Sequence, residues 1–138
     1  MRLISITGRA VNRNVNKYLI DWDKKSRSKI QFKTKQFLKE YWENHIVYEE
    51  FPVYGTRLKV DIVNATKKIA VEVNGAQHSS FNKFFHGDSR QNFLRSIKRD
   101  CKKLAWLELN GFEIIEIEEK EVPLLSYEFI KEQFGVEI

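Results

Sequence analysis

Two carboxylates interrupt apolar runs typical of β-strands, and they are the residues best placed to do chemistry. Asp61 lies within Leu58–Val63, and Glu72 lies within Ile69–Val73. A carboxylate in a central strand is costly unless it is paired, protonated or bound to a metal ion. In a hairpin both side chains can project from one face, where paired carboxylates bind a divalent cation such as Mg²⁺. A solvated sheet face explains the same alternation and stays open as the alternative.

The segment after Glu72 adds an amide and an imidazole around a glycine turn. It reads Glu72-Val73-Asn74-Gly75-Ala76-Gln77-His78 and leads into a long segment, residues 75–90, which we expect to be a loop. A histidine on a loop at a strand end can serve as general base, general acid or metal ligand. We therefore count His78 as a candidate catalytic residue, with Gln77 and Asn74 as supporting or phosphate-binding groups.

A basic segment further along the chain surrounds one acid with four cations. Asp100 is flanked by Lys98, Arg99, Lys102 and Lys103. Asp100 is a candidate third acid of the site, and the cations are candidate phosphate contacts. A solvated helix face with weak local ion pairs is the alternative.

The periodicity of the chain predicts helices and strands in an order that can place these groups together. Ser28 is a plausible N-cap with Gln31 three residues later, as in a capping box. We expect helices at 29–44, 89–109 and 124–134, and strands at 46–53, 57–64, 68–74 and 112–117. The second and third strands should form an antiparallel hairpin, and the helix before the last strand permits a parallel crossover. The fold class is therefore α/β, with helices packed on a sheet.

Composition limits the class of protein and of partner. The 138 residues favour one domain, the single Cys101 excludes an intramolecular disulfide, and apolar runs are too short for a membrane span or signal peptide. The net charge of +5 combines +7 in residues 1–45 with −6 in residues 112–138, which suggests a polyanionic partner. We expect residues 1–26 to be a basic arm with little regular structure, either lying along phosphates or disordered, before a single domain at 27–138.

These motifs together resemble the PD-(D/E)XK nuclease superfamily, and within it the very-short-patch-repair (Vsr)-like branch that includes the EDxHD homing endonucleases of phages. The resemblance covers roughly residues 28–117 and combines Asp61, the segment from Glu72 to His78, Arg99-Asp100-Cys101-Lys102-Lys103 and Asn110-Gly111-Phe112. It implies a restriction-endonuclease-like αβββαβ core with a mixed central sheet flanked by helices.

The resemblance also implies roles for individual residues. Asp61, Glu72 and the Val73 carbonyl match metal ligands, and His78 and Asp100 match the catalytic pair of the Vsr-like branch. The first-helix acid of the family is replaced by Gln31, with Glu40 as the alternative match. The superfamily lysine two residues after the strand acid is Asn74 here, so His78 would have to take over its proton-transfer role.

The function implied is a Mg²⁺-dependent DNA endonuclease, with Mn²⁺ as a substitute, that leaves 5′-phosphate ends. The expected DNA contacts are Lys35, Asn74, Lys98, Arg99, Lys102 and Lys103, with Phe84 and Phe85 as base wedges or, equally, packing residues. We expect a cytoplasmic protein of a bacterial or phage-infected cell without a membrane partner; a homodimer is left open. The alternatives are a non-catalytic DNA-binding module on the same fold and an assembly protein whose arm docks on an acidic partner.

Overall fold

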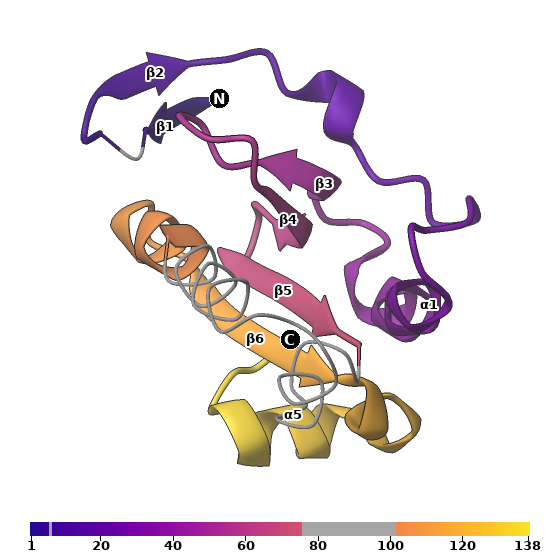
Figure 1. Cartoon of the computed structure of the whole chain (residues 1–138). Helices are drawn as coiled ribbons and strands as arrows, with labels where there is room; N and C mark the ends of the chain where they lie inside the picture. Colours follow the sequence, from indigo (N-terminus) through magenta and orange to yellow (C-terminus); the bar gives the residue numbers. More distant parts are fainter. Residues whose placement is uncertain (6, 76–101) are drawn as a thin grey trace, which may run out of the picture.

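The computed structural model describes residues 1–5, 7–75 and 102–138, and these form a mixed α/β structure (Figure 1). Residues 102–109 are helical and lead through a turn into the last strand. The other elements, in chain order, are β1 (Arg2–Ile4), β2 (Ala10–Asn12), the 3₁₀ turn η1 (Asn16–Tyr18), α1 (Lys29–Trp42), β3 (Val47–Pro52), β4 (Lys59–Asn64), β5 (Ile69–Asn74), β6 (Glu113–Glu118), η2 (Glu119–Leu124) and α5 (Tyr127–Phe134).

The main sheet has the strand order β3-β4-β5-β6 within the described residues. β3 and β4 are antiparallel, β4 and β5 form the expected antiparallel hairpin, and β6 runs parallel to β5 along its whole length. The parallel pair needs a crossover between β5 and β6, and the helical residues 102–109 lie in that connection. The mixed sheet and the α/β class are therefore confirmed.

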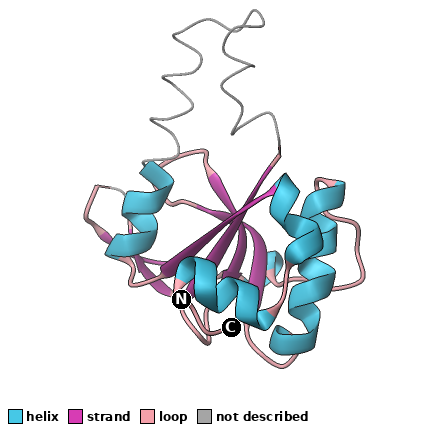
Figure 2. Ribbon diagram, turned by 90° about the horizontal axis from the view of Figure 1, so that it is seen from below, coloured by secondary structure: helices cyan, strands magenta, loops and turns pink. Residues whose placement is uncertain are grey.

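Both faces of this sheet are covered, as Figure 2 shows with helices on either side of the strands. On one face Leu38 and Trp42 of α1 and Ile130 of α5 pack with Ile62 and Ile69 of the hairpin. On the other face the buried residues come from the strands, the N-terminal segment and the 102–109 helix, and they include Leu3, Val15, Phe51, Val63, Trp106 and Leu107. Burial on both faces explains why β4 and β5 are nearly continuous apolar runs.

Helix α1 starts where the cap predicts, because the Ser28 hydroxyl accepts a hydrogen bond from the Gln31 amide at 3.2 Å. Among the described residues, the cap of α1 is the Ser28 hydroxyl alone, and the Gln31 side chain donates through Nε2 to Glu49 and Glu50. The helix ends at Trp42, two residues before the predicted end.

The N-terminal arm corrects one expectation, because it contains regular structure and packs on the domain. β1 and β2 pair in an antiparallel register, and Leu3 is only 2% exposed. The Asn110 side chain accepts a hydrogen bond from the Ile4 amide at 2.8 Å and donates to the Ile4 carbonyl at 3.0 Å. Asn110 therefore mimics a neighbouring strand and ties β1 to the end of the 102–109 helix.

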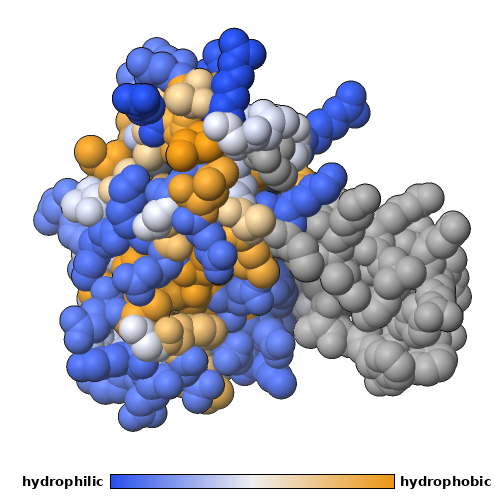
Figure 3. All heavy atoms as spheres, turned by 90° about the vertical axis from the view of Figure 1, so that its left-hand side faces the viewer, coloured by the Kyte–Doolittle hydropathy of each residue, from blue (hydrophilic) through white to orange (hydrophobic). Residues whose placement is uncertain are grey.

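The arm is nonetheless strongly charged on its outer side. Figure 3 shows hydrophilic side chains projecting from the upper end of the molecule, where β1 and β2 lie. The exposed cations of the arm are Arg2, Arg9 and Arg13 in the β1–β2 segment (residues 2–13), followed by Lys17, Lys24 and Lys25.

The C-terminal helix begins three residues later than predicted. Residues 119–124 form the 3₁₀ segment η2, and α5 starts at Tyr127 after Ser126, whose hydroxyl accepts from the Phe129 amide. In the described ranges, no helix is both long and apolar enough to cross a membrane.

Candidate metal centre

The candidate site lies where β4 and β5 stop pairing through their backbones. The paired residues of the two strands run from Asn64–Ile69, beside the hairpin turn, to Ile62–Val71, and the backbone pairing ends there. Asp61 and Glu72 are the next residues of the two strands, and their side chains connect the strands instead. Asp61 Oδ2 accepts from the Val73 amide at 2.8 Å, and Glu72 Oε1 accepts from the Asp61 amide at 3.3 Å.

Both carboxyl groups are buried in the sheet, at 8% exposure for Asp61 and 7% for Glu72. Burial raises the pKa of Asp61 to about 6, although the Val73 amide and the charges of Lys103 and Arg27 act against this rise. Burial and the neighbouring Asp61 charge raise the pKa of Glu72 to about 8. Two carboxylates that are desolvated and repel each other favour any cation that can neutralise them.

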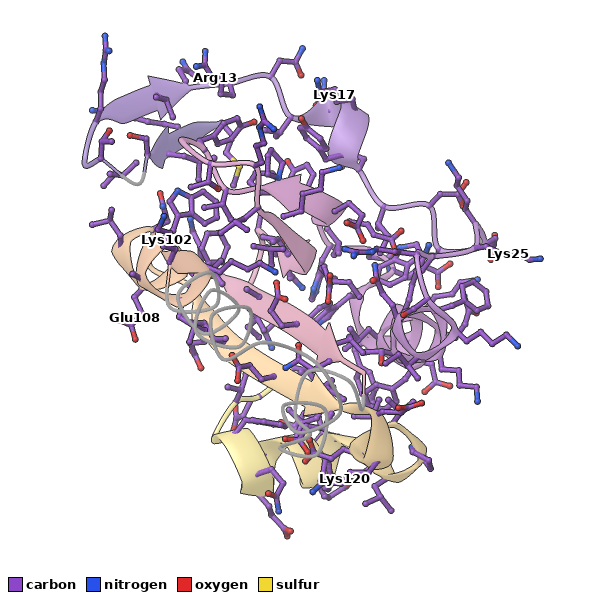
Figure 4. All side chains as sticks on the ribbon, viewed as in Figure 1. Arg13, Lys17, Lys25, Lys102, Glu108 and Lys120 are labelled. Atoms are coloured by element: carbon purple, nitrogen blue, oxygen red, sulfur yellow. The ribbon has the colours of Figure 1, made fainter. Side chains whose placement is uncertain are left out.

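One such cation comes from the chain itself. Lys103, in the first turn of the described helical residues 102–109, places Nζ 3.2 Å from Glu72 Oε2. The sequence predicts that Lys103 contacts a phosphate, whereas the structure directs it into the carboxylate pair. Its neighbour Lys102 is exposed on the same helix, where a phosphate contact stays a prediction (Figure 4).

Glu50 is an acidic residue near the site that sequence reasoning missed. It lies on β3 at the position that the register sets opposite Asp61, and its charge contributes to the raised pKa of Asp61. Its φ of 52° is left-handed, which is unusual for a residue inside a strand. The run Glu49-Glu50 in a predicted strand was the available signal, but the backbone angle is not visible in the sequence.

Gln31 of α1, which matches the first-helix acid of the family, donates hydrogen bonds to Glu50 and to its neighbour Glu49. Gln31 is 3% exposed, and its Nε2 donates to Glu49 Oε2 at 3.0 Å and to Glu50 Oε1 at 3.1 Å. Glu40, the alternative match, is exposed on α1. Gln31 therefore lies beside Glu50 as a hydrogen-bond donor and holds an acid whose charge acts on Asp61.

Lys35 corrects the expectation that it contacts DNA. Its side chain is 0% exposed, and Nζ binds Glu49 Oε1 at 2.9 Å and the Lys24 carbonyl at 2.8 Å. Glu49 also accepts from Ser26 and Gln31, so the buried charge pair has hydrogen-bond partners. Lys35 is a structural residue that joins α1 to β3.

The donor set fits a hard divalent cation with few protein ligands. Mg²⁺ is commonly held by one or two carboxylates and keeps several waters, and Asp61 and Glu72 supply two carboxylates at one place. Across residues 1–5, 7–75 and 102–138, the acidic, histidine and cysteine side chains form no group of three able to hold a metal. Val73 adjoins the pair through its amide, and its carbonyl stays a predicted ligand.

The remaining predicted site residues are divided between the end of β5 and the undescribed segment. Asn74 is the last residue of β5, in register with Glu118 of β6. Outside the described residues lie Gln77, His78, Phe84, Phe85, Lys98, Arg99 and Asp100.

Comparison with known proteins finds two viral relatives of unstated activity. The chain is 33% identical over 66 residues to Uncharacterized protein 094L of Frog virus 3, which covers 48% of this chain and 43% of that protein. It is 35% identical over 66 residues to Uncharacterized protein 033L of Invertebrate iridescent virus 3, covering 48% and 34%. The chain therefore matches less than half the length of these relatives. No family model and no solved structure matches.

Proposed function

We propose that this protein is a divalent-metal-dependent DNA endonuclease, with Mg²⁺ as the metal and Mn²⁺ as a substitute. The observation that carries the proposal is the pair of buried carboxylates, Asp61 and Glu72, at the point where two central strands separate. The hydrogen bonds from backbone amides offset only part of the cost of burying two acids that repel each other, so a cation that both acids bind explains the arrangement best.

The residues of the chain have distinct tasks in this proposal. Asp61 and Glu72 would hold the cation, and the hydrogen bonds that they accept from the Val73 and Asp61 amides fix the positions of the two carboxylates. A bound divalent cation lowers the pKa of a ligated water and stabilises negative charge on the phosphoryl oxygens. His78 would accept a proton from the attacking water, oriented by Asp100, as the resemblance to the Vsr-like branch implies.

The charge of the chain supports a polyanionic substrate. Residues 1–45 carry a net charge of +7, and the exposed cations of the β1–β2 segment belong to this region. Lysine and arginine side chains contribute sequence-independent affinity by neutralising phosphates. The acidic residues 112–138 include Glu116 and Glu118 of β6, which lie in register with Glu72 and Asn74, so part of this acidic segment adjoins the candidate site. The cellular location of the protein stays a prediction.

The test is cleavage of supercoiled plasmid with Mg²⁺, with Mn²⁺ and with EDTA. We expect Asp61→Asn and Glu72→Gln to lower the rate about 100-fold or more, the equivalent of about 2.7 kcal/mol of transition-state stabilisation. Glu113→Gln, an exposed acid on β6, is the matched control and should cleave like the wild type. DNA ligase should reseal the nicks without added kinase if the ends are 5′-phosphate and 3′-hydroxyl. Equal background nicking by all the proteins would refute the proposal.

Asn74 supports a second candidate, a non-catalytic DNA-binding module on the same fold. An asparagine cannot transfer the proton that a lysine or histidine can. This alternative predicts salt-sensitive DNA binding that survives Glu72→Gln, with no metal-dependent cleavage by the wild type.

A further inference from the structure

Glu72 has one carboxylate oxygen, Oε2, that accepts no backbone hydrogen bond from the described residues and could bind a metal ion. Lys103 already contacts this oxygen. Glu72 Oε1 accepts from the Asp61 amide at 3.3 Å, and Glu72 Oε2 lies 3.2 Å from Lys103 Nζ. Asp61 Oδ2 accepts from the Val73 amide. Two of these hydrogen bonds come from backbone amides of β4 and β5, so breaking them would require the strands to move. The Lys103 contact comes from a side chain, which can leave Glu72 without any movement of the sheet.

We infer that Lys103 is a built-in counter-cation that neutralises the Asp61–Glu72 pair in the metal-free protein and releases Glu72 when a divalent cation binds. The inference rests on the proposed metal site and adds a competition between a side chain of the protein and the metal. It also assigns to Lys103 a positioning role, because its ammonium group holds the Glu72 carboxylate between β4 and β5 until a divalent cation replaces the lysine.

The local structure suits such an exchange. The Lys103 side chain is 19% exposed, so its ammonium can reach solvent after leaving Glu72. The helix that carries it is anchored in the core by Trp106 and Leu107, which are 1% and 0% exposed. A lysine has a flexible stem of four carbons, so the charge can move while the helix stays fixed.

The first experiment measures Mn²⁺ affinity from the electron paramagnetic resonance signal of the free ion, without DNA. Lys103→Met and Lys103→Gln remove the competing charge, and we expect about tenfold tighter Mn²⁺ binding. Lys103→Arg keeps a cation and should bind Mn²⁺ no more tightly than the wild type. Lys33→Met, at an exposed lysine of α1, is the control and should leave the affinity unchanged. Circular dichroism establishes that each variant is folded.

The second experiment uses the wild-type protein and measures acetylation of lysines by an N-hydroxysuccinimide ester with mass-spectrometric detection. Saturating Mn²⁺ should increase the labelling rate of Lys103 several-fold while that of Lys102 changes little, because only Lys103 loses a carboxylate partner. Unchanged labelling, together with unchanged or weaker Mn²⁺ binding by Lys103→Met, would overturn the inference while leaving the metal site in place. A wild type that binds no Mn²⁺ and does not cleave DNA would overturn both the inference and the proposed function.

Discussion

Asp61 of β4 and Glu72 of β5 each accept a hydrogen bond from a backbone amide of the other strand, beyond the point where the backbone pairing of the two strands ends. The Asp61 carboxylate accepts from the amide of Val73, the residue after Glu72, and the Glu72 carboxylate accepts from the amide of Asp61 itself. Backbone donors that lose their ladder partners need other acceptors, and here the two candidate metal ligands provide them. Strand geometry and site geometry are therefore set by the same two side chains.

The stability of the metal-free protein should fall as the pH rises. The folded-state pKa values of Asp61 and Glu72, about 6 and about 8, lie above their usual values. The folded protein therefore binds more protons than the unfolded chain, so the stability contributed by the protonated acids is full below about pH 4 and is lost as the pH passes through 6 and 8. Urea denaturation in EDTA between pH 5 and 8 should show wild type losing on the order of 2 kcal/mol relative to Glu72→Gln. Parallel pH profiles for wild type and Glu72→Gln would contradict the assignment, and Glu113→Gln should follow the wild type.

Lys35→Met should destabilise the protein by about 3 kcal/mol. The substitution leaves the partly buried Glu49 without its cation and removes the donor to the Lys24 carbonyl. Lys33→Met, an exposed lysine on the same helix, should change the free energy of unfolding by less than about 0.5 kcal/mol. The measurement is urea denaturation at neutral pH. Equal stability of the two variants would show that the buried pair contributes little.

Glu50 should tolerate glycine better than valine, because its φ of 52° suits a residue without a Cβ. Both variants lose the hydrogen bond from Gln31 and the charge that acts on Asp61. Their difference therefore reports the backbone strain, and Glu50→Gly should be more stable than Glu50→Val by about 1–2 kcal/mol. Thermal and urea denaturation of the two variants side by side measure this difference. Equal stability would mean that β3 relaxes to an extended conformation at this position.

The local pattern of apolar residues predicted the central elements well. β4 and β5 lie within the predicted strands 57–64 and 68–74, because their alternation and short connection are local properties. β1 and β2 have three residues each and depend on contacts far away in sequence, such as the bonds between Ile4 and Asn110, so no local pattern indicates them. The 102–109 helix shows the same limit. In this helix the structure buries Trp106 and Leu107 and exposes Ala105 and Glu108, and which side chains are buried depends on how the helix packs on the sheet.

Site prediction was limited by the same distinction between local and distant contacts. Asp61 and Glu72 were identified because a carboxylate is conspicuous in an apolar strand. Glu50 and the Lys103–Glu72 pair depend on strand register and on the placement of a distant helix. The interior position of Lys35 likewise follows from the packing of α1 on β3, which a helical period alone does not specify.

The exposed arginines of the N-terminal segment should contribute to DNA affinity without contributing to the fold. Arg2 and Arg9 are exposed, while the packing of this segment depends on Leu3 and the Asn110 bonds. Because each neutralised phosphate contributes about 0.9 to the salt dependence of binding, Arg2→Gln combined with Arg9→Gln should reduce the slope of log K against log salt by about 2. Fluorescence anisotropy of a labelled duplex in EDTA measures this slope independently of cleavage. Lys120→Gln removes a cation at the opposite end of the molecule from Arg13 and should leave the slope unchanged (Figure 4). A double variant with an unaltered slope would place the DNA away from the β1–β2 segment and leave the charge of that segment without a role in binding.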